Sequence, residues 1–176
     1  MAYILIDGYN LIGIAHENLV SARNKLLEDL KDYSELKNHT ITVVFDGWKS
    51  GNRNQTRVST RQVTVIYTRI GDTADIVIQR MLTPGARPWI VVSSDRAISD
   101  FAEKREYAVV TSEEFEEKLF KALHRCSTES IPDFRGYEED PAEYGSGSVQ
   151  KAYPAKDSSR KHSRKHKKRI QALKKL

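Results

Sequence analysis

The chain opens with AYILIDGYN (residues 2–10), an apolar run that ends in a carboxylate, a glycine and a carboxamide. Residues 3–6 are rich in β-branched and aromatic side chains without polar alternation, which is typical of a central parallel strand buried on both faces. In an open α/β sheet, ligands bind at the carboxyl ends of the strands. The stretch therefore predicts a buried strand that brings Asp7 to that edge.

A second strand is predicted to end beside the first. Apolar residues at helical spacing over residues 17–36 indicate an amphipathic helix, and the β-prone residues 40–45 then lead into Asp46 and Gly47. A strand, a helix and a strand in this order form a βαβ unit, whose strands run parallel with a right-handed crossover. Asp46 is therefore expected at the same edge as Asp7.

A polar loop and a third strand follow. Residues 48–60 show neither a helical nor a strand period and predict a flexible basic loop beside the carboxylate edge, whereas residues 62–67 predict a strand. A helix is then expected to open at Asp72 and Asp75 and to end at Pro84. Because Asp72 and Asp75 are three positions apart, they would share a face of that helix.

The same alternation continues to about residue 123. Residues 89–92 predict another apolar strand, which ends at Asp95, the third aspartate at a strand end. A short helix (96–105) and a last strand (107–110) follow, and Ser112 is expected to cap the final helix. Strands that alternate with helices indicate an α/β layered domain.

The net charge of +5 divides unevenly along the chain. Residues 151–176 hold eleven Lys and Arg against one Asp, whereas residues 1–150 hold 18 basic and 23 acidic side chains. A basic tail on an acidic body indicates a polyanionic partner, and nucleic acid fits better than a membrane because the tail has few large apolar residues. No apolar run approaches the roughly 20 residues of a membrane span. We therefore expect a cytoplasmic protein without a membrane partner.

Three regions are predicted from these patterns. Residues 1–127 form the α/β domain, and residues 128–159, where prolines and glycines interrupt any period, form an irregular arm or linker. Residues 160–176 form a basic C-terminal tail, which we expect to become helical on binding. The thin apolar stripe of that tail would consist of Ile170, Leu173 and Leu176.

The predicted convergence of aspartates suits a divalent cation. Carboxylates in one crevice repel one another unless they are protonated or neutralised by a cation. Oxygen ligands are those that Mg²⁺ and Mn²⁺ prefer, and the single cysteine, Cys126, excludes a cysteine zinc cluster. Such a site suits phosphodiester cleavage. The candidate ligands are Asp7, Asp46, Asp72, Asp75 and Asp95, and Asn10 could orient a water or a carboxylate beside them.

Each aspartate also has a purely structural interpretation. Asp-Gly is a favoured turn sequence after a strand, and this would account for Asp7 and Asp46. Asp72 and Asp95 suit helix N-caps, and Asp75 would then be an acidic residue in a first helical turn. Strand-end aspartates gathered at one edge are harder to explain in this way together than singly. The metal site is therefore the preferred interpretation.

The ordered motifs resemble a known family. The residues that carry the resemblance are Ile6-Asp7-Gly8-Tyr9-Asn10-Leu11-Ile12, Val44-Phe45-Asp46-Gly47, Gly71-Asp72-Thr73-Ala74-Asp75 and Ser93-Ser94-Asp95. Together they resemble the YacP-like branch of the NYN domains, within the PIN-like nuclease superfamily, over residues 1–124. The resemblance implies a PIN-like three-layer α/β/α sandwich with a central, mainly parallel sheet. It also implies a Mg²⁺- or Mn²⁺-dependent endoribonuclease that acts on single-stranded RNA, in some members on the ribosome.

By position, the resemblance implies that Asp7, Asp75 and Asp95 are the catalytic metal ligands and that Asn10 supports them. Asp46 is a second choice as a ligand. Asp72 is another, and it departs from the family's pattern, in which a longer Glu is expected. No small-molecule cofactor is expected, because neither G-x-G-x-x-G nor a P-loop follows the first strand.

Basic and aromatic residues near the predicted site suit RNA. A negative site repels RNA, so neighbouring cations would have to hold the phosphate backbone, and aromatic rings stack on unpaired bases. The predicted RNA-binding residues are Trp48, Lys49, Arg53, Arg57, Arg61, Arg69 and Tyr9. The tail is expected to bind RNA or the ribosome in a salt-dependent way. The structural alternatives are a solvated loop, packing of Trp48 against the sheet edge, and a tail that only confers solubility.

Three functions stay open on these grounds. The preferred one is a metal-dependent endoribonuclease, with the ribosome as a second candidate partner. The alternative is a non-catalytic RNA- or ribosome-binding factor with a PIN-like fold, whose aspartates are structural. A phosphatase with Asp7 as covalent nucleophile is disfavoured, because Tyr9 occupies the position where that chemistry usually needs an acid.

Overall fold

A mixed six-stranded sheet forms the centre of the protein in the computed structural model, which describes residues 1–13, 18–47, 54–83, 85–124 and 158–176. The strands, in chain order, are β1 (Tyr3–Asp7), β2 (Thr40–Phe45), β3 (Thr56–Thr60), β4 (Val63–Tyr67), β5 (Trp89–Val92) and β6 (Ala108–Val110). Their order across the sheet is β3-β4-β2-β1-β5-β6. Every neighbouring pair is parallel except β3 and β4.

β1 is the point in the sheet where the order of the strands reverses. The chain runs from β1 to β2 and β4 on one side, and then returns to place β5 and β6 on the other side. β1 therefore pairs with β2 and β5, with Ile6 opposite Val43 and Val92. In open α/β sheets, the crevice outside the carboxyl ends of the strands at such a switch point is where ligands bind. Asp7, the last residue of β1, lies at this point.

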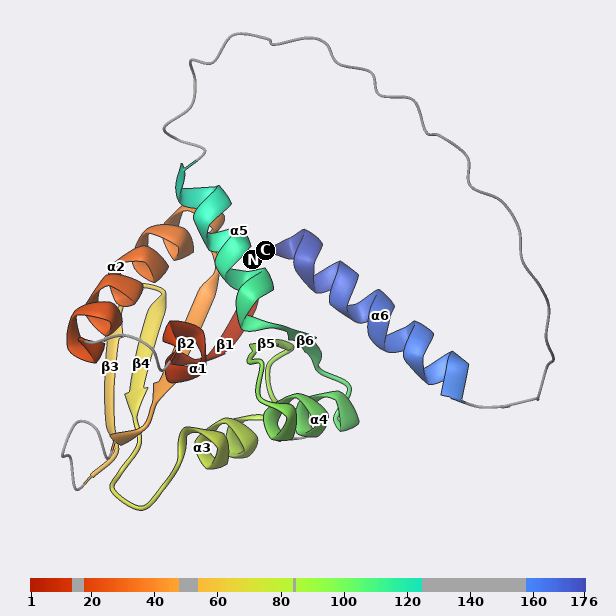
Figure 1. Cartoon of the computed structure of the whole chain (residues 1–176), viewed down its shortest axis with the longest axis horizontal. Coiled ribbons are helices and arrows are strands. Elements are labelled where there is room, and N and C mark those ends of the chain that lie inside the picture. The colour runs from red at the N-terminus through yellow and green to blue at the C-terminus, as the bar shows by residue number, and fades with distance from the viewer. Residues whose placement is uncertain (14–17, 48–53, 84, 125–157) are drawn as a thin grey trace, which may run out of the picture.

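Helices cover both faces of the sheet, as Figure 1 shows. One face carries α1 (Gly8–Ile12), α2 (Leu19–Lys37) and α5 (Ser112–His124), and the other carries α3 (Ala74–Met81) and α4 (Arg96–Lys104). The alternation of β1 explains the two cores, because Ile4 and Ile6 point into the first and Leu5 into the second. The prediction of an α/β fold with a central, mainly parallel sheet between helices is confirmed.

The sequence-based boundaries need two corrections. The loop predicted for residues 48–60 is wrong over Thr56–Thr60, which forms β3 antiparallel to β4. This edge strand is largely exposed, so its sequence lacks the apolar alternation that marks a half-buried strand. Residues 48–53 lie outside the described residues, as does most of the predicted arm.

The cap of α5 also differs from the prediction. Thr111 and Glu114 exchange hydrogen bonds, from the Glu114 N–H to Thr111 Oγ1 (3.3 Å) and from the Thr111 N–H to Glu114 Oε2 (3.1 Å). This reciprocal pair is a capping box. The prediction that Ser112 caps the helix is therefore wrong, because Ser112 is already the first helical residue. Its hydroxyl is used elsewhere.

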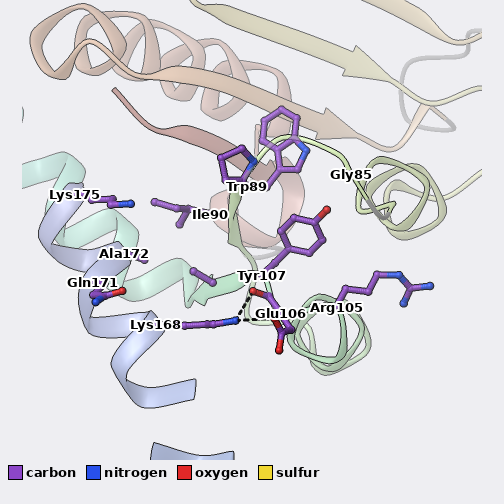
Figure 2. A pocket seen from close by; sticks show the side chains of 12 residues that line it. Gly85, Trp89, Ile90, Arg105, Glu106, Tyr107, Lys168, Gln171, Ala172 and Lys175 are labelled. Atoms are coloured by element: carbon purple, nitrogen blue, oxygen red, sulfur yellow. Dashed lines mark hydrogen bonds and ion pairs between the residues drawn. The ribbon is translucent and has the colours of Figure 1, made fainter. Parts of the chain in front are cut away.

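A last helix, α6 (Ser158–Lys175), packs along β6 at the edge of the sheet (Figure 1). Ala172 and Leu176 are buried in the first core, whereas Ile170 is exposed, so the predicted apolar stripe is only partly right. Figure 2 shows Lys168 reaching Glu106, whose carbonyl it bonds at 2.9 Å. Two further ion pairs join α6 to the domain, Lys165–Glu103 and Arg169–Glu114.

A hollow of about 430 Å³ lies between α6 and the amino ends of β5 and β6, with Trp89, Tyr107 and Lys168 among its lining residues (Figure 2). It lies at the amino ends of the strands and so is apart from Asp7, which lies at the carboxyl end of β1. Within the described ranges, none of the helices is both long and apolar enough to cross a membrane.

Candidate functional site

Asp7 is held at the switch point by its own backbone neighbours. It follows the buried residues of β1 and caps α1, since its Oδ1 accepts a hydrogen bond of 3.2 Å from the N–H of Asn10. Only 7% of the residue is exposed. The next residue must be small, because a Cβ on Gly8 would lie 2.3 Å from the Phe45 ring. This close approach lets α1 start directly at the end of the strand.

Asp46 joins the end of β2 to the start of α3. Its Oδ1 accepts a hydrogen bond of 2.5 Å from the N–H of Ala74. The loop is fixed by Gly47, whose N–H donates to Thr68 Oγ1 at 2.8 Å and whose Cβ position would overlap the Thr68 carbonyl oxygen. Because Asp75 follows Ala74, this anchor also brings Asp75, in the first turn of α3, toward the same edge.

Asp95 caps α4 from the end of β5. Its Oδ1 accepts hydrogen bonds from the N–H groups of Ala97 (2.6 Å) and Ile98 (3.3 Å). The predicted capping role is confirmed for Asp95, whereas α3 is capped by Thr73 and not by Asp72. Asp72 instead bonds the guanidinium groups of Arg69 (3.1 Å) and Arg80 (3.0 Å). Its partial burial would raise its pKa, but these two partners lower it below the ordinary value.

Four of the five aspartates interact electrostatically. The pKa of the Asp7 carboxyl is raised from 3.8 to about 6, by burial first, against the lowering effect of the Asn10 N–H, and then by the charges of Asp75, Asp46 and Asp95. The pKa of Asp75 is also raised, by burial first and then by Asp95 and Asp46. Asp72 is not among the main causes of either shift. The structure therefore brings together Asp7, Asp46, Asp75 and Asp95.

The donor chemistry of this group fits a hard divalent cation. All four side chains offer carboxylate oxygens, and Asp46 and Asp95 each use only Oδ1 for a helix N–H. No ion pair joins any of the four to a Lys or Arg within the described ranges. Nor do three of the described His, Cys, Asp or Glu side chains surround one common point. Binding one ion through three of these side chains would therefore require side-chain rotation.

Asn10 connects three elements at the same edge. Its Oδ1 accepts hydrogen bonds from the N–H of Ser94 (2.7 Å), after β5, and from the hydroxyl of Ser112 (2.6 Å), at the start of α5. Ser94 Oγ in turn accepts a bond from the Ser112 N–H (3.0 Å) and donates to Glu113 (3.0 Å). This network is not predicted from the sequence. The only sequence signal for it is a serine two positions after the last residue of each of β5 and β6.

The predicted RNA-binding residues have different surroundings. Arg61 pairs with Glu35 and Arg69 pairs with Asp72, so both engage acidic groups of the protein itself. Arg57 lines a hollow of about 300 Å³ on the α3 side of the sheet. The other residues lining it are Thr40, Thr42, Thr64, Met81, Ala86, Arg87 and Trp89. Trp48, Lys49 and Arg53 lie outside the described residues.

Tyr9 is partly buried against the sheet. Its ring meets Phe45 edge to face, with centroids 5.1 Å apart. Burial raises the pKa of the Tyr9 hydroxyl, and the charge of Arg23 and a hydrogen bond to it oppose the shift; Arg23 is not among the RNA-binding residues predicted from the sequence. The Arg23 guanidinium also lies 5.4 Å above the Tyr67 ring.

Comparisons with known proteins agree with this architecture. The model of the YacP-like NYN domain family matches residues 4–169. Two crystal structures of Rae1 (YacP) from Bacillus subtilis are similar to this chain at 22% sequence identity. The first, a point mutant, superposes with a TM-score of 0.59, and the match covers 72% of this chain and 80% of the Rae1 chain. The second has a TM-score of 0.57, and the match covers 72% of this chain and 78% of the Rae1 chain. No curated protein matches the chain.

Proposed function

Because the chain belongs to the YacP-like NYN domain family, we propose that it is a Mg²⁺- or Mn²⁺-dependent endoribonuclease that hydrolyses phosphodiester bonds of single-stranded RNA. Family membership supports a nuclease-like function that acts on RNA. The observation that carries the finer proposal is the set of four interacting aspartates at the switch point of the sheet, without an ion pair to a described Lys or Arg.

The proposed metal ligands are Asp7, Asp75 and Asp95, with Asp46 next to them. A bound divalent ion would supply an activated water and stabilise the leaving oxygen. The pKa values of Asp7 and Asp75 are raised by burial first and then by neighbouring aspartate charges, and this second contribution supports the role, because a cation would relieve that repulsion. Asp72 is a poor choice, because its carboxylate is already paired with Arg69 and Arg80.

RNA is the proposed partner on electrostatic grounds. The hollow beside α3 contains Arg57 and Arg87 but no acidic residue, which suits a phosphate backbone. On α6, Lys165 and Arg169 face acidic partners of the domain, whereas Arg164, Lys167 and Lys174 are exposed and form no ion pair with a described residue. A basic surface of this kind also supports the ribosome as a second partner.

Cleavage of an unstructured RNA tests the proposal. The wild-type protein should cut with Mg²⁺ or Mn²⁺ and not with EDTA, and Asp7→Asn and Asp95→Asn should abolish cutting while the circular dichroism spectrum stays unchanged. Asp100→Asn is the matched control, because Asp100 is an exposed aspartate on α4, the helix that Asp95 caps. Full activity in both site variants would show that these carboxylates have no catalytic role.

A non-catalytic RNA- or ribosome-binding factor is the second candidate. It is favoured by the fact that Asp46 and Asp95 both have structural tasks at helix N-termini. This function predicts RNA binding that is independent of divalent ions and that survives Asp7→Asn, with no cleavage of RNA free or on ribosomes. A gel-shift assay run beside the cleavage assay distinguishes the two candidates.

A further inference from the structure

The carboxamide of Asn10 has a defined orientation. The atom that lies 2.7 Å from the Ser94 N–H must be the amide oxygen, because a backbone N–H can only donate. The Ser112 hydroxyl, 2.6 Å from the same atom, therefore donates as well. A carbonyl oxygen accepts two hydrogen bonds through its two lone pairs. Both are used, so this oxygen is not available as a metal ligand.

The other end of the carboxamide is a donor without a partner in the part of the chain that the structure describes. Asn10 Nδ2 has no hydrogen bond to any described residue, and it is not among the described buried atoms that lack a partner. It is therefore in contact with solvent, on a residue whose backbone N–H bonds the Asp7 carboxylate. A fixed N–H donor beside a carboxylate cluster is suited to an anionic oxygen of a ligand.

We propose that Ser112 is a positioning residue, which together with the Ser94 N–H holds Asn10 so that Nδ2 donates a hydrogen bond to a non-bridging oxygen of the scissile phosphate. This inference rests on the proposed ribonuclease function and deepens it. The bond strengthens as negative charge builds on the phosphoryl oxygens in the transition state, so it acts on kcat more than on RNA binding.

The Ser112 hydroxyl has no competing structural task. The N-terminus of α5 is capped by Thr111 and Glu114, and the backbone N–H of Ser112 is bonded to Ser94 Oγ. Its hydroxyl is buried, with the residue 5% exposed, and its one hydrogen bond within the described residues goes to Asn10. Replacing it should therefore release the Asn10 side chain and leave the helix cap in place.

Steady-state cleavage of a fluorescent unstructured RNA with Mn²⁺ tests the inference. Ser112→Ala should lower kcat by about tenfold or more with KM within about twofold, and Ser112→Thr, which keeps the hydroxyl, should restore most of the rate. The matched control is Ser34→Ala, because Ser34 is a buried serine on α2 whose hydroxyl donates to the Lys31 carbonyl, away from the carboxylate edge. This control should keep the wild-type kcat.

A double-mutant cycle separates positioning from general damage. Asn10→Ala and Ser112→Ala should cost no more together than Asn10→Ala alone, since Ser112 acts through Asn10. Mn²⁺ affinity, measured by calorimetry, should be unchanged in both single variants. The inference would be overturned by additive losses in the double variant, by a drop in Mn²⁺ affinity, or by a wild-type kcat in Ser112→Ala. None of these outcomes would contradict the proposed function as long as the wild-type protein cleaves RNA. A wild-type protein that cuts no RNA would overturn both.

Discussion

The hydroxyl of Tyr33 donates a hydrogen bond of 2.7 Å to the backbone carbonyl of Leu176, 143 positions later in the chain. Beside it, His39 Nε2 bonds the carbonyl of Lys175 at 2.9 Å. The last carbonyls of a helix have no partner within the helix itself. Side chains from α2 and from the turn before β2 thus satisfy the C-terminal end of α6, which joins the basic helix to the first core.

Tyr33→Phe should destabilise the protein by about 1–2 kcal/mol, because the Leu176 carbonyl would be left buried without a donor. Urea denaturation measures the change in the free energy of unfolding. Tyr107→Phe is the control, since its hydroxyl also bonds a backbone carbonyl, that of Thr83, but in an exposed place. Equal losses of stability in the two variants would mean that the buried bond from Tyr33 to Leu176 contributes no more to folding than the exposed bond from Tyr107 to Thr83.

Mild acid should loosen α6 through His39. Burial lowers the pKa of this ring below the ordinary 6.5, so its stabilising contribution is present above pH 6.5 and is lost as the pH falls through the lowered folded-state value. Backbone amides of α6 should therefore exchange hydrogen faster at pH 5.5 than at pH 7.5, relative to those of β1. His39→Gln, which keeps a donor but does not titrate, should remove this difference. If His39→Gln keeps the difference in amide exchange between the two pH values, another group causes it.

Much of the fold could be predicted from local pattern, because buried strands have a direct signature. The apolar runs of β1, β2 and β5 mark strands covered on both faces, and the parallel arrangement then places Asp7, Asp46 and Asp95 at one edge. β3 could not be found in this way, since an exposed edge strand needs no apolar face. The docking of α6 also escaped prediction, because it depends on Tyr33 and His39, which are more than a hundred positions away.

The chemistry of the site could be predicted only in part. Strand ends identify which carboxylates approach one another, but not how each oxygen is used. The family resemblance makes Asp72 a second-choice ligand beside Asp46, whereas its pairing with Arg69 and Arg80 depends on the path of the loop before α3. The bond between Asn10 and Ser112 spans 102 positions and has no local pattern. Hydrogen bonds of this range follow from tertiary packing.

Asp7→Asn should stabilise the metal-free protein at neutral pH. The folded-state pKa of Asp7 is about 6 against 3.8, so the native state binds more protons in this window and its stability falls as the pH rises through it. Removing the charge should raise the free energy of unfolding at pH 7 by up to about 3 kcal/mol. The gain, measured by urea denaturation in EDTA, should vanish near pH 4. A gain that is constant with pH would point to a cause other than ionisation.

Mn²⁺ should stabilise the wild-type protein, because a cation at the carboxylate edge relieves the repulsion that, after burial, raises the pKa values of Asp7 and Asp75. Binding to the native state alone adds about 2.7 kcal/mol at a concentration of 100 Kd. Thermal unfolding with Mn²⁺ and with EDTA should show a higher Tm with the ion, a much smaller shift in Asp7→Asn and Asp75→Asn, and the wild-type shift in Asp100→Asn. Equal shifts in all four proteins would place the ion elsewhere, whereas loss of the shift in Asp7→Asn and Asp75→Asn alone would locate it at the switch point of the sheet.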